Sequence, residues 1–292
     1  MNHEQLAQKN FYHEINQPEE EINLAKAALY IAQTAYPELD PNPWLDTLDA
    51  MARDIRKRLK AERYPLQVIR TINQYLYNDL GFQGNSKDYY NPRNSFLNDV
   101  LERRKGIPIT LSLVYLEIAQ RLDFPMVGIG MPGHFLIRPD FTDAGVFVNA
   151  FNAGETLFEQ DCEELLSRLY RQPVELQPQY LEAVTKQQFL ARMLTNLKFI
   201  YLNQEELTQA LTIVEMILLV FPSAAKEIRD RGLLCFELGK WERAKQDLEF
   251  YLAMVPDAGD FDIVKNILGK MAWHSPPKLM RYSLSSKLIA NS

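Results

Sequence analysis

Residues 108–122, PITLSLVYLEIAQRL, constrain the fold of this chain most, because they predict a helix with almost no polar side. Its apolar residues fall on nearly every side of a helix rather than on one stripe. Pro108 suits the first helical position, since its missing N–H would have had no partner within the helix. Such a helix has to be covered on most sides, so the rest of its domain is expected to pack around it.

Four short runs rich in β-branched and aromatic residues follow this helix and predict a small antiparallel sheet. The runs are residues 126–130, 134–138, 145–149 and 155–158. If Arg138 pairs with Gly145, the register places His134 directly opposite Asn149, with Cβ atoms about 5 Å apart. We therefore expect a histidine and a carboxamide to face each other on one face of the sheet.

The chain before the buried helix is predicted to be mainly helical. Residues 1–17 are polar without a clear period and are interpreted as a loosely held lead-in. Apolar residues then recur at helical spacing, and a turn-rich loop with Tyr89, Tyr90 and Asn94 precedes a short further helix. The predicted helices are residues 18–36, 44–60, 65–80 and 95–105. Helices followed by a sheet indicate an α+β domain over residues 18–175.

Residues 185–270 are predicted to form a separate, all-α region after a connector that contains two prolines. Several of its positions recur 34 residues later, and a proline closes each repeat. The recurring pairs are Ala210 and Ala244, Val214 and Leu248, Ile217 and Tyr251, and Pro222 and Pro256. This pattern resembles the tetratricopeptide repeat, which implies closely packed helix pairs. Gly232 and Cys235 occupy the expected packing positions, whereas Lys198 replaces a small residue.

The composition argues against several classes of partner and cofactor. The formal charge is -6, with 38 acidic against 32 basic residues, so we expect no nucleic acid and no anionic membrane surface as partner. The chain shows neither an apolar run of about 20 residues nor a secretion signal, which predicts a cytoplasmic protein. Two cysteines and four scattered histidines predict no disulfide framework, no metal site and no cofactor. Residues 274–292 lack a period and are expected to be disordered.

The segment around the buried helix is similar to the transglutaminase-like superfamily. In that superfamily a Gly-x-Cys motif opens the central helix, a Gly-Ile-Pro-like turn ends it, and a histidine and an aspartate follow on adjacent strands. Residues 106–108 and 123–125 match the motif and the turn, and His134 and Asn149 match the two strand residues. The resemblance implies a cysteine-protease-like fold in which Pro108 replaces the nucleophilic cysteine and Asn149 replaces the aspartate.

Residues 20–270 also resemble the bacterial SirB-type proteins. The words GIPIT-LS and GHFL, followed by the helical repeats, carry this resemblance. It implies a transglutaminase-like domain joined to a tetratricopeptide-repeat region, and it implies no particular reaction.

The candidate site residues have alternative interpretations. His134 is either a site residue or a polar residue at a sheet edge. Thr110 and Ser112 are potential nucleophiles, but buried helical hydroxyls more often bond to the helix backbone. Asn94 and Tyr90 could line a cleft or only anchor their loop. Cys162 and Cys235 are expected to be inert, because no base adjoins either in the sequence.

These observations favour a non-catalytic binding or adaptor protein with a protein or peptide partner. Pro108 has no side chain capable of nucleophilic attack, and helical repeats often contact other proteins. The alternative is a hydrolase or acyltransferase of altered mechanism that uses His134 as general base. A third interpretation assigns the repeats to self-association.

Overall fold

The computed structural model describes residues 3–60, 64–141 and 145–273, and the chain divides into two compact units. The first unit extends to Met193 and the second begins at Leu194. Residues 274–292, for which disorder was predicted, lie outside the described residues. Among the described residues, no helix has both the length and the apolar character that a membrane span requires.

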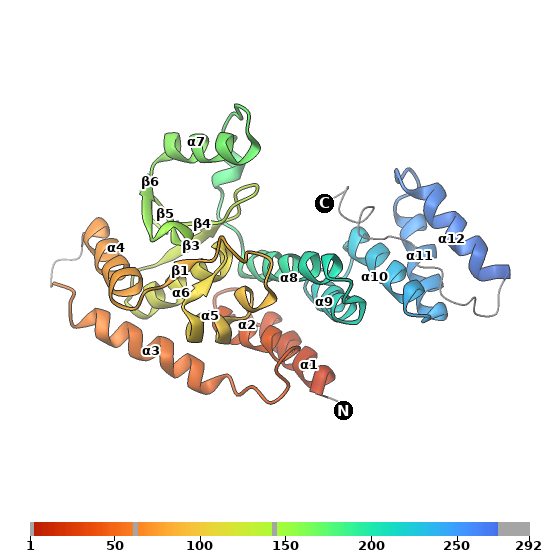
Figure 1. Ribbon diagram of the computed structural model, residues 1–292, viewed down its shortest axis with the longest axis horizontal. Coiled ribbons are helices and arrows are strands. Elements are labelled where there is room, and N and C mark those ends of the chain that lie inside the picture. Colours follow the sequence, from red (N-terminus) through yellow and green to blue (C-terminus); the bar gives the residue numbers. More distant parts are fainter. Residues whose placement is uncertain (1–2, 61–63, 142–144, 274–292) are drawn as a thin grey trace. The chain divides into compact units, whose positions relative to one another are not determined.

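Helix α6 (Pro108–Arg121) lies within the first unit with other elements on several sides (Figure 1). Every residue from Pro108 to Ala119 is buried, and Tyr115 and Ile118 have no exposed surface. Ile107 is extended, with φ −100° and ψ 170°, as expected for a residue before proline. The prediction of a helix that is covered on almost all sides is therefore confirmed.

The helices that precede α6 in the chain pack around it. Among them, α2, α3 and α5 contact α6 directly, and the two-residue strands β1 and β2 pair in parallel beside it. The elements are α1 (His3–Ile15), α2 (Leu24–Ala32), α3 (Asn42–Arg56), α4 (Pro65–Asn73), its π-helical continuation η1 (Gln74–Asp79), β1 (Gln83–Gly84), the 3-10 turn η2 (Pro92–Asn94), α5 (Leu97–Arg103) and β2 (Lys105–Gly106).

The interpretation of residues 1–17 as a loosely held lead-in is wrong, because residues 3–15 form helix α1. Ala7, Phe11 and Ile15 follow one another at intervals of four residues, so they share one face of the helix. All three are buried, and α1 packs on α2. The polar residues between them conceal this narrow apolar face in the sequence.

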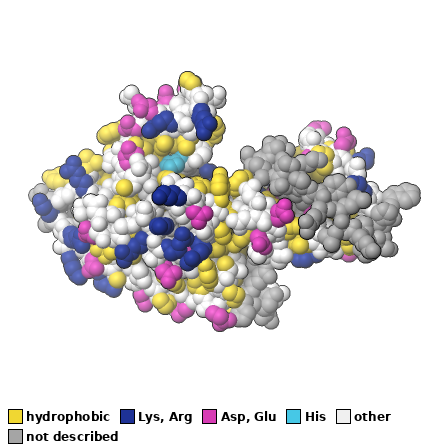
Figure 2. All heavy atoms as spheres, in the orientation of Figure 1, with side chains coloured by type: hydrophobic (Ala, Val, Ile, Leu, Met, Phe, Trp, Pro, Cys, Tyr) yellow, Lys and Arg dark blue, Asp and Glu magenta, His cyan; other side chains and the backbone are white. Residues whose placement is uncertain are grey.

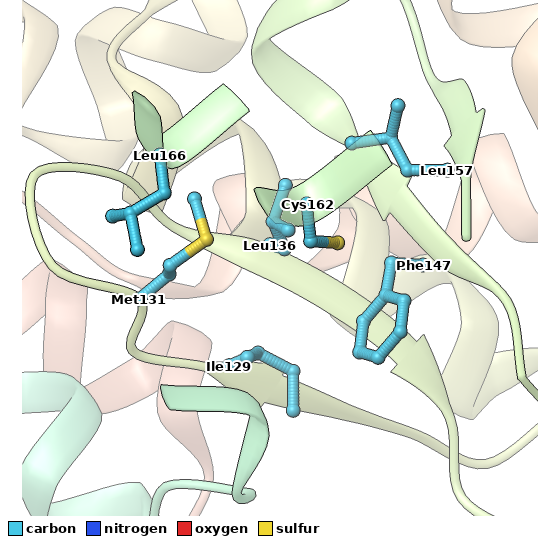
Figure 3. Close-up of a cluster of buried hydrophobic side chains, with 7 residues drawn as sticks. All are labelled: Ile129, Met131, Leu136, Phe147, Leu157, Cys162 and Leu166. Atoms are coloured by element: carbon cyan, nitrogen blue, oxygen red, sulfur yellow. The ribbon is translucent and has the colours of Figure 1, made fainter. Parts of the chain in front are cut away.

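A four-stranded antiparallel sheet follows α6, with the strands in chain order β3-β4-β5-β6. Helix α7 packs beside β6, and the side chains of strands and helix meet in a buried cluster (Figure 3). The elements are β3 (Met126–Ile129), β4 (Leu136–Pro139), β5 (Phe147–Asn149), the 3-10 turn η3 (Ala150–Asn152), β6 (Glu155–Leu157) and α7 (Glu159–Tyr170). The cluster comprises Ile129, Met131, Leu136, Phe147, Leu157, Cys162 and Leu166.

The register between β4 and β5 differs from the predicted one by two residues. Ile137 pairs with Val148, whereas the predicted register places Ile137 opposite Val146. Gly145 has a left-handed backbone (φ 54°) and belongs to the turn, so β5 begins only at Phe147. Because side chains alternate between the two faces of a sheet, a shift of two residues leaves each one on its predicted face.

The second unit consists of antiparallel helix pairs. Gly232 of α10 allows the close packing with α11, since a Cβ atom at this position would lie 2.8 Å from the side chain of Leu248. Ala210, Ala244 and Cys235 are also buried, as the repeat pattern predicts. The elements are the 3-10 turn η4 (Pro178–Leu181) and α8 (Lys186–Asn203), which lead into the unit, then α9 (Leu207–Val220), α10 (Ala225–Glu237), α11 (Trp241–Met254) and α12 (Phe261–Trp273).

Lys198 occupies a small-residue position of the repeat and forms a buried ionic network instead. Its Nζ lies 2.6 Å from a Glu227 carboxylate oxygen and 3.0 Å from Asp230. Asp230 also pairs with Arg229, which in turn pairs with Asp260. Burial by itself lowers the pKa of Lys198, but the charges of Asp230 and Glu227 outweigh this effect and raise the pKa. The lysine therefore remains charged and links α8 to α10.

Removing this lysine charge should destabilise the second unit. We expect Lys198→Met to lower the free energy of unfolding by about 3–5 kcal/mol, because it leaves the largely buried Glu227 without a cation and Asp230 with Arg229 alone. Urea denaturation of the full chain measures the loss. Lys245→Met is the matched control, since Lys245 and Glu249 are both more than half exposed and their pair contributes at most about 1 kcal/mol. Similar losses in both variants would contradict the network.

Replacing Phe11 tests whether α1 belongs to the core. Phe11 has no exposed surface, so Phe11→Ala should lower the free energy of unfolding by about 3–5 kcal/mol. The neighbouring Tyr12 is 51% exposed, and Tyr12→Ala should change it by about 0.5 kcal/mol or less. Denaturation curves followed by circular dichroism compare the two. Equal effects would mean that α1 does not pack as described.

Candidate functional site

The start of α6 is held by the hydroxyl of Thr110. Thr110 Oγ1 accepts a hydrogen bond from the Ile107 N–H at 3.1 Å and donates its proton to the Asn94 carbonyl at 2.7 Å. Thr110 is fully buried, and a Cβ atom on Gly106 would lie only 2.7 Å from this hydroxyl. The hydroxyl that was a candidate nucleophile thus ties the first turn of α6 to the preceding loop.

The side chain of Asn94 holds the turn-rich loop together. Its Nδ2 donates to the carbonyls of Asp88 at 2.6 Å and Tyr89 at 3.2 Å. Its Oδ1 accepts from Asn85 at 3.0 Å and from Arg103 at 3.4 Å. Asn94 is fully buried, so its amide shapes the loop that carries the two tyrosines.

His134 and Asn149 form the hydrogen bond that defines the candidate site. His134 Nε2 lies 3.0 Å from Asn149 Oδ1, although His134 precedes β4 and is not directly opposite Asn149 as predicted. The turn at Gly133 (φ 72°) and the bond from the His134 N–H to the Met131 carbonyl hold the histidine in place. The observed register differs from the predicted one by two residues, so His134 and Asn149 are diagonal neighbours rather than directly opposite. The long imidazole side chain still reaches the Asn149 amide.

A second bond determines the tautomer of His134. Asn149 Oδ1 also accepts the backbone N–H of Asn152 at 3.3 Å, so this atom of the amide is an acceptor. The Nε2 of His134 must therefore carry a proton and donate it, which leaves Nδ1 with a lone pair. No described residue forms a hydrogen bond with this Nδ1.

Burial keeps the imidazole neutral. His134 is 8% exposed, and loss of hydration lowers its pKa below the ordinary value of about 6.5. The bond to Asn149 opposes this shift, whereas the positive charge of Arg192 adds to it. At neutral pH His134 is thus an acceptor at Nδ1 and a donor at Nε2.

A row of aromatic rings leads from the surface to His134. The ring centroid of Phe151 lies 6.2 Å from that of His134 and 6.1 Å from that of Tyr89, and Tyr89 lies 5.3 Å from Tyr90. Tyr90 is 58% exposed and forms the outer end of the row. The sequence reasoning missed Phe151 and Arg192, because neither belongs to the motif and Arg192 comes from a later helix.

The remaining potential nucleophiles are buried. Ser112 has no exposed surface, and its Oγ has no hydrogen-bond partner within the described part of the chain. Burial raises the pKa of the Cys162 thiol to about 12, helped by the charges of Asp161 and Glu159, and Cys162 lies in the cluster of Figure 3. Burial also raises the pKa of Cys235. Neither thiol is poised to form a reactive thiolate.

The described residues also include no group of three His, Cys, Asp or Glu side chains that could hold a metal ion.

Two family models match the two parts of the chain. The model described as transglutaminase-like superfamily matches residues 42–195, and the tetratricopeptide repeat model matches residues 197–269. These matches confirm the predicted fold class, an α+β transglutaminase-like domain followed by helical repeats.

Curated relatives are similar to this chain over more than half of its length. A UPF0162 protein of Xylella fastidiosa is 35% identical over 257 residues, covering 86% of this chain and 90% of that protein. A UPF0162 protein of Pseudomonas aeruginosa is 31% identical over 253 residues, covering 85% and 91%. F-box only protein 21 of Homo sapiens is 31% identical over 188 residues, covering 60% of this chain and 29% of that protein. The chain therefore belongs to the UPF0162 family and joins a transglutaminase-like domain to a tetratricopeptide-repeat region.

Proposed function

We propose that this protein is a non-catalytic binding or adaptor protein, built on a transglutaminase-like domain that has lost its nucleophile. The observation that carries the proposal is the combination of Pro108 at the start of α6 with an intact His134–Asn149 hydrogen bond. The pair orients an imidazole as it would beside a catalytic thiol, but proline supplies no atom for attack.

Neither of the two hydroxyls near the start of α6 in the described chain supports a substitute nucleophile. Thr110 uses its hydroxyl to hold the turn, and Ser112 is enclosed within α6 packing. A buried, neutral His134 with an unused Nδ1 is instead suited to accept a hydrogen bond from a bound ligand. The helical repeats favour a protein or peptide as partner. The SirB-type assignment and a cytoplasmic location are part of the same proposal.

Restoring the cysteine tests whether position 108 faces His134. In Pro108→Cys the helix N-terminus and the imidazole should lower the thiol pKa below its ordinary value of about 8.5. The ultraviolet absorbance of the thiolate measures this pKa, with the buried Cys162 and Cys235 as silent background. Adding His134→Gln should raise the thiol pKa again.

Pro65→Cys is the matched control, because Pro65 also opens a helix but is exposed and belongs to no site. It should show only the effect of a helix N-terminus. A thiol at position 108 that does not respond to His134→Gln would contradict the interpretation of a degenerate thiol site.

Two functional measurements test the proposal directly: turnover of model substrates, and capture of a protein partner. We expect the wild-type protein and His134→Ala to be equally inactive on a panel of amides and esters. Affinity capture with the wild type should retain a reproducible protein partner that His134→Ala loses. Turnover that depends on His134, without such a partner, would refute the proposal.

A second candidate function is hydrolysis or acyl transfer with His134 as general base. The unpartnered, unprotonated Nδ1 favours it, because this atom can take a proton from water. Activity of this kind would be constant above neutral pH and would fall only at a pH below the ordinary imidazole pKa of about 6.5, because burial lowers the pKa of His134. The same panel of amides and esters, measured across pH, distinguishes this function from binding.

A further inference from the structure

Three polar side chains around the candidate site have hydrogen-bonding atoms that the protein does not use. They are the Nδ1 of His134, the hydroxyl of Tyr89 and the guanidinium of Arg192. None of these groups hydrogen-bonds to, or pairs with, another side chain in residues 3–60, 64–141 and 145–273. None of these atoms is a fully buried polar atom without a partner, so all three are accessible to solvent and therefore to a ligand.

The rings of the site bring two of these groups together. Phe151 packs edge-on against His134 on one side and against Tyr89 on the other, with centroid distances of 6.2 and 6.1 Å. Phe151 follows Asn149 directly in the turn η3, so the bond that orients His134 also places this ring. Tyr89 and His134 are therefore held on the same short stretch of surface.

Arg192 reaches this stretch from α8. It lies one helical turn after Phe189, whose ring packs on Phe135 at a centroid distance of 4.9 Å, and Phe135 is the neighbour of His134. The positive charge of Arg192 acts on both His134 and Tyr89: it adds to the burial that lowers the pKa of His134, and it opposes the burial that raises the pKa of Tyr89. The contact between Phe189 and Phe135 and the effect of the Arg192 charge together indicate that the guanidinium lies near both side chains.

Arg192 forms no ion pair with a carboxylate of the described residues, unlike Arg93 and Arg121 of the same unit. Arg93 pairs with Asp99, and Arg121 pairs with both Asp49 and Glu117. Arg192 is partly buried, and its guanidinium is still accessible to solvent. A negatively charged ligand would supply the counterion that the described side chains do not.

We propose that Arg192, Tyr89 and His134 form a binding site for the carboxylate of a peptide. The guanidinium can hold a carboxylate through two parallel hydrogen bonds, and the Tyr89 hydroxyl supplies a third donor. His134 Nδ1 can accept a peptide N–H next to that carboxylate. Figure 2 shows Lys and Arg side chains gathered over β1 and α5, which would attract an acidic peptide despite the net charge of -6. This inference rests on the proposed binding function and names its ligand class.

Titration with short peptides followed by NMR tests the site. The probes are N-acetyl-Ala-Ala-Glu-amide, its Gln counterpart, and N-acetyl-Ala-Ala-Ala with a free C-terminal carboxylate. We expect at least one carboxylate probe to shift the His134 imidazole signals with saturation, while the Gln probe does not. Comparison of the two carboxylate probes shows whether the ligand group is a side chain or a chain terminus.

The variants separate a specific site from general charge. Arg192→Gln should weaken binding at least about 10-fold, and Tyr89→Phe about 3-fold or more, because it removes one hydroxyl and keeps the ring. Arg70→Gln, at an exposed arginine of α4, should leave binding unchanged. Thermal unfolding confirms that each variant is folded. Arg192→Lys keeps the positive charge but loses the paired N–H donors of the guanidinium, so it should bind with intermediate affinity.

Two results would overturn the inference: no saturable binding of either carboxylate probe, or equal weakening by Arg192→Gln and Arg70→Gln. Neither result bears on the thiol pKa of Pro108→Cys or on partner capture, so the proposed binding function could survive it. Hydrolysis of the probes by the wild type, lost in His134→Ala, would instead refute the proposed function itself.

Discussion

The burial of α6 on almost all sides is the constraint on which the first unit depends. This helix exposes very little of its surface. Helices from the N-terminal part of the chain and strands of the sheet that follows therefore pack against it. The first turn of α6 is also held in place. Pro108 restricts Ile107 to an extended backbone, and the Thr110 hydroxyl bonds to Ile107 and Asn94. The candidate site lies on a rigid framework for this reason.

The hydrogen bond between His134 and Asn149 is held in place by that framework. A buried imidazole without a partner would be costly, and the amide of Asn149 satisfies one ring nitrogen while leaving the other unused. The amide is itself oriented by the Asn152 N–H. An arrangement with this much support around one unused acceptor is more consistent with a site than with a polar residue at a sheet edge. Under the proposed function, Pro108 separates this arrangement from thiol catalysis, and Arg192 supplies a positive charge near it.

The second unit reaches close helix packing by two different means. At Gly232 the absence of a side chain lets α11 approach, as a helical repeat requires. At Lys198 the same kind of position holds a long cation, and acidic residues of α10 surround its end. The departure from the repeat pattern was visible in the sequence, but its carboxylate partners lie about 30 residues away on another helix and carry no local signal.

The sequence by itself determined the buried central helix, the four strands and the repeat helices, because periodicity and proline placement are local properties. It also picked out His134, Asn149 and Pro108 as the residues of the candidate site. The prediction from sequence was wrong at residues 3–15, where three apolar residues among polar ones were too few to indicate a helix. It was also wrong at Gly145, whose left-handed backbone belongs to the turn and changes the strand register by two residues. Only the tertiary structure decided the tautomer of His134, the commitment of Thr110 and Asn94 to the loop, and the approach of Phe151 and Arg192. These features depend on contacts between segments far apart in the chain, and no local pattern of residues specifies which distant side chain will meet another.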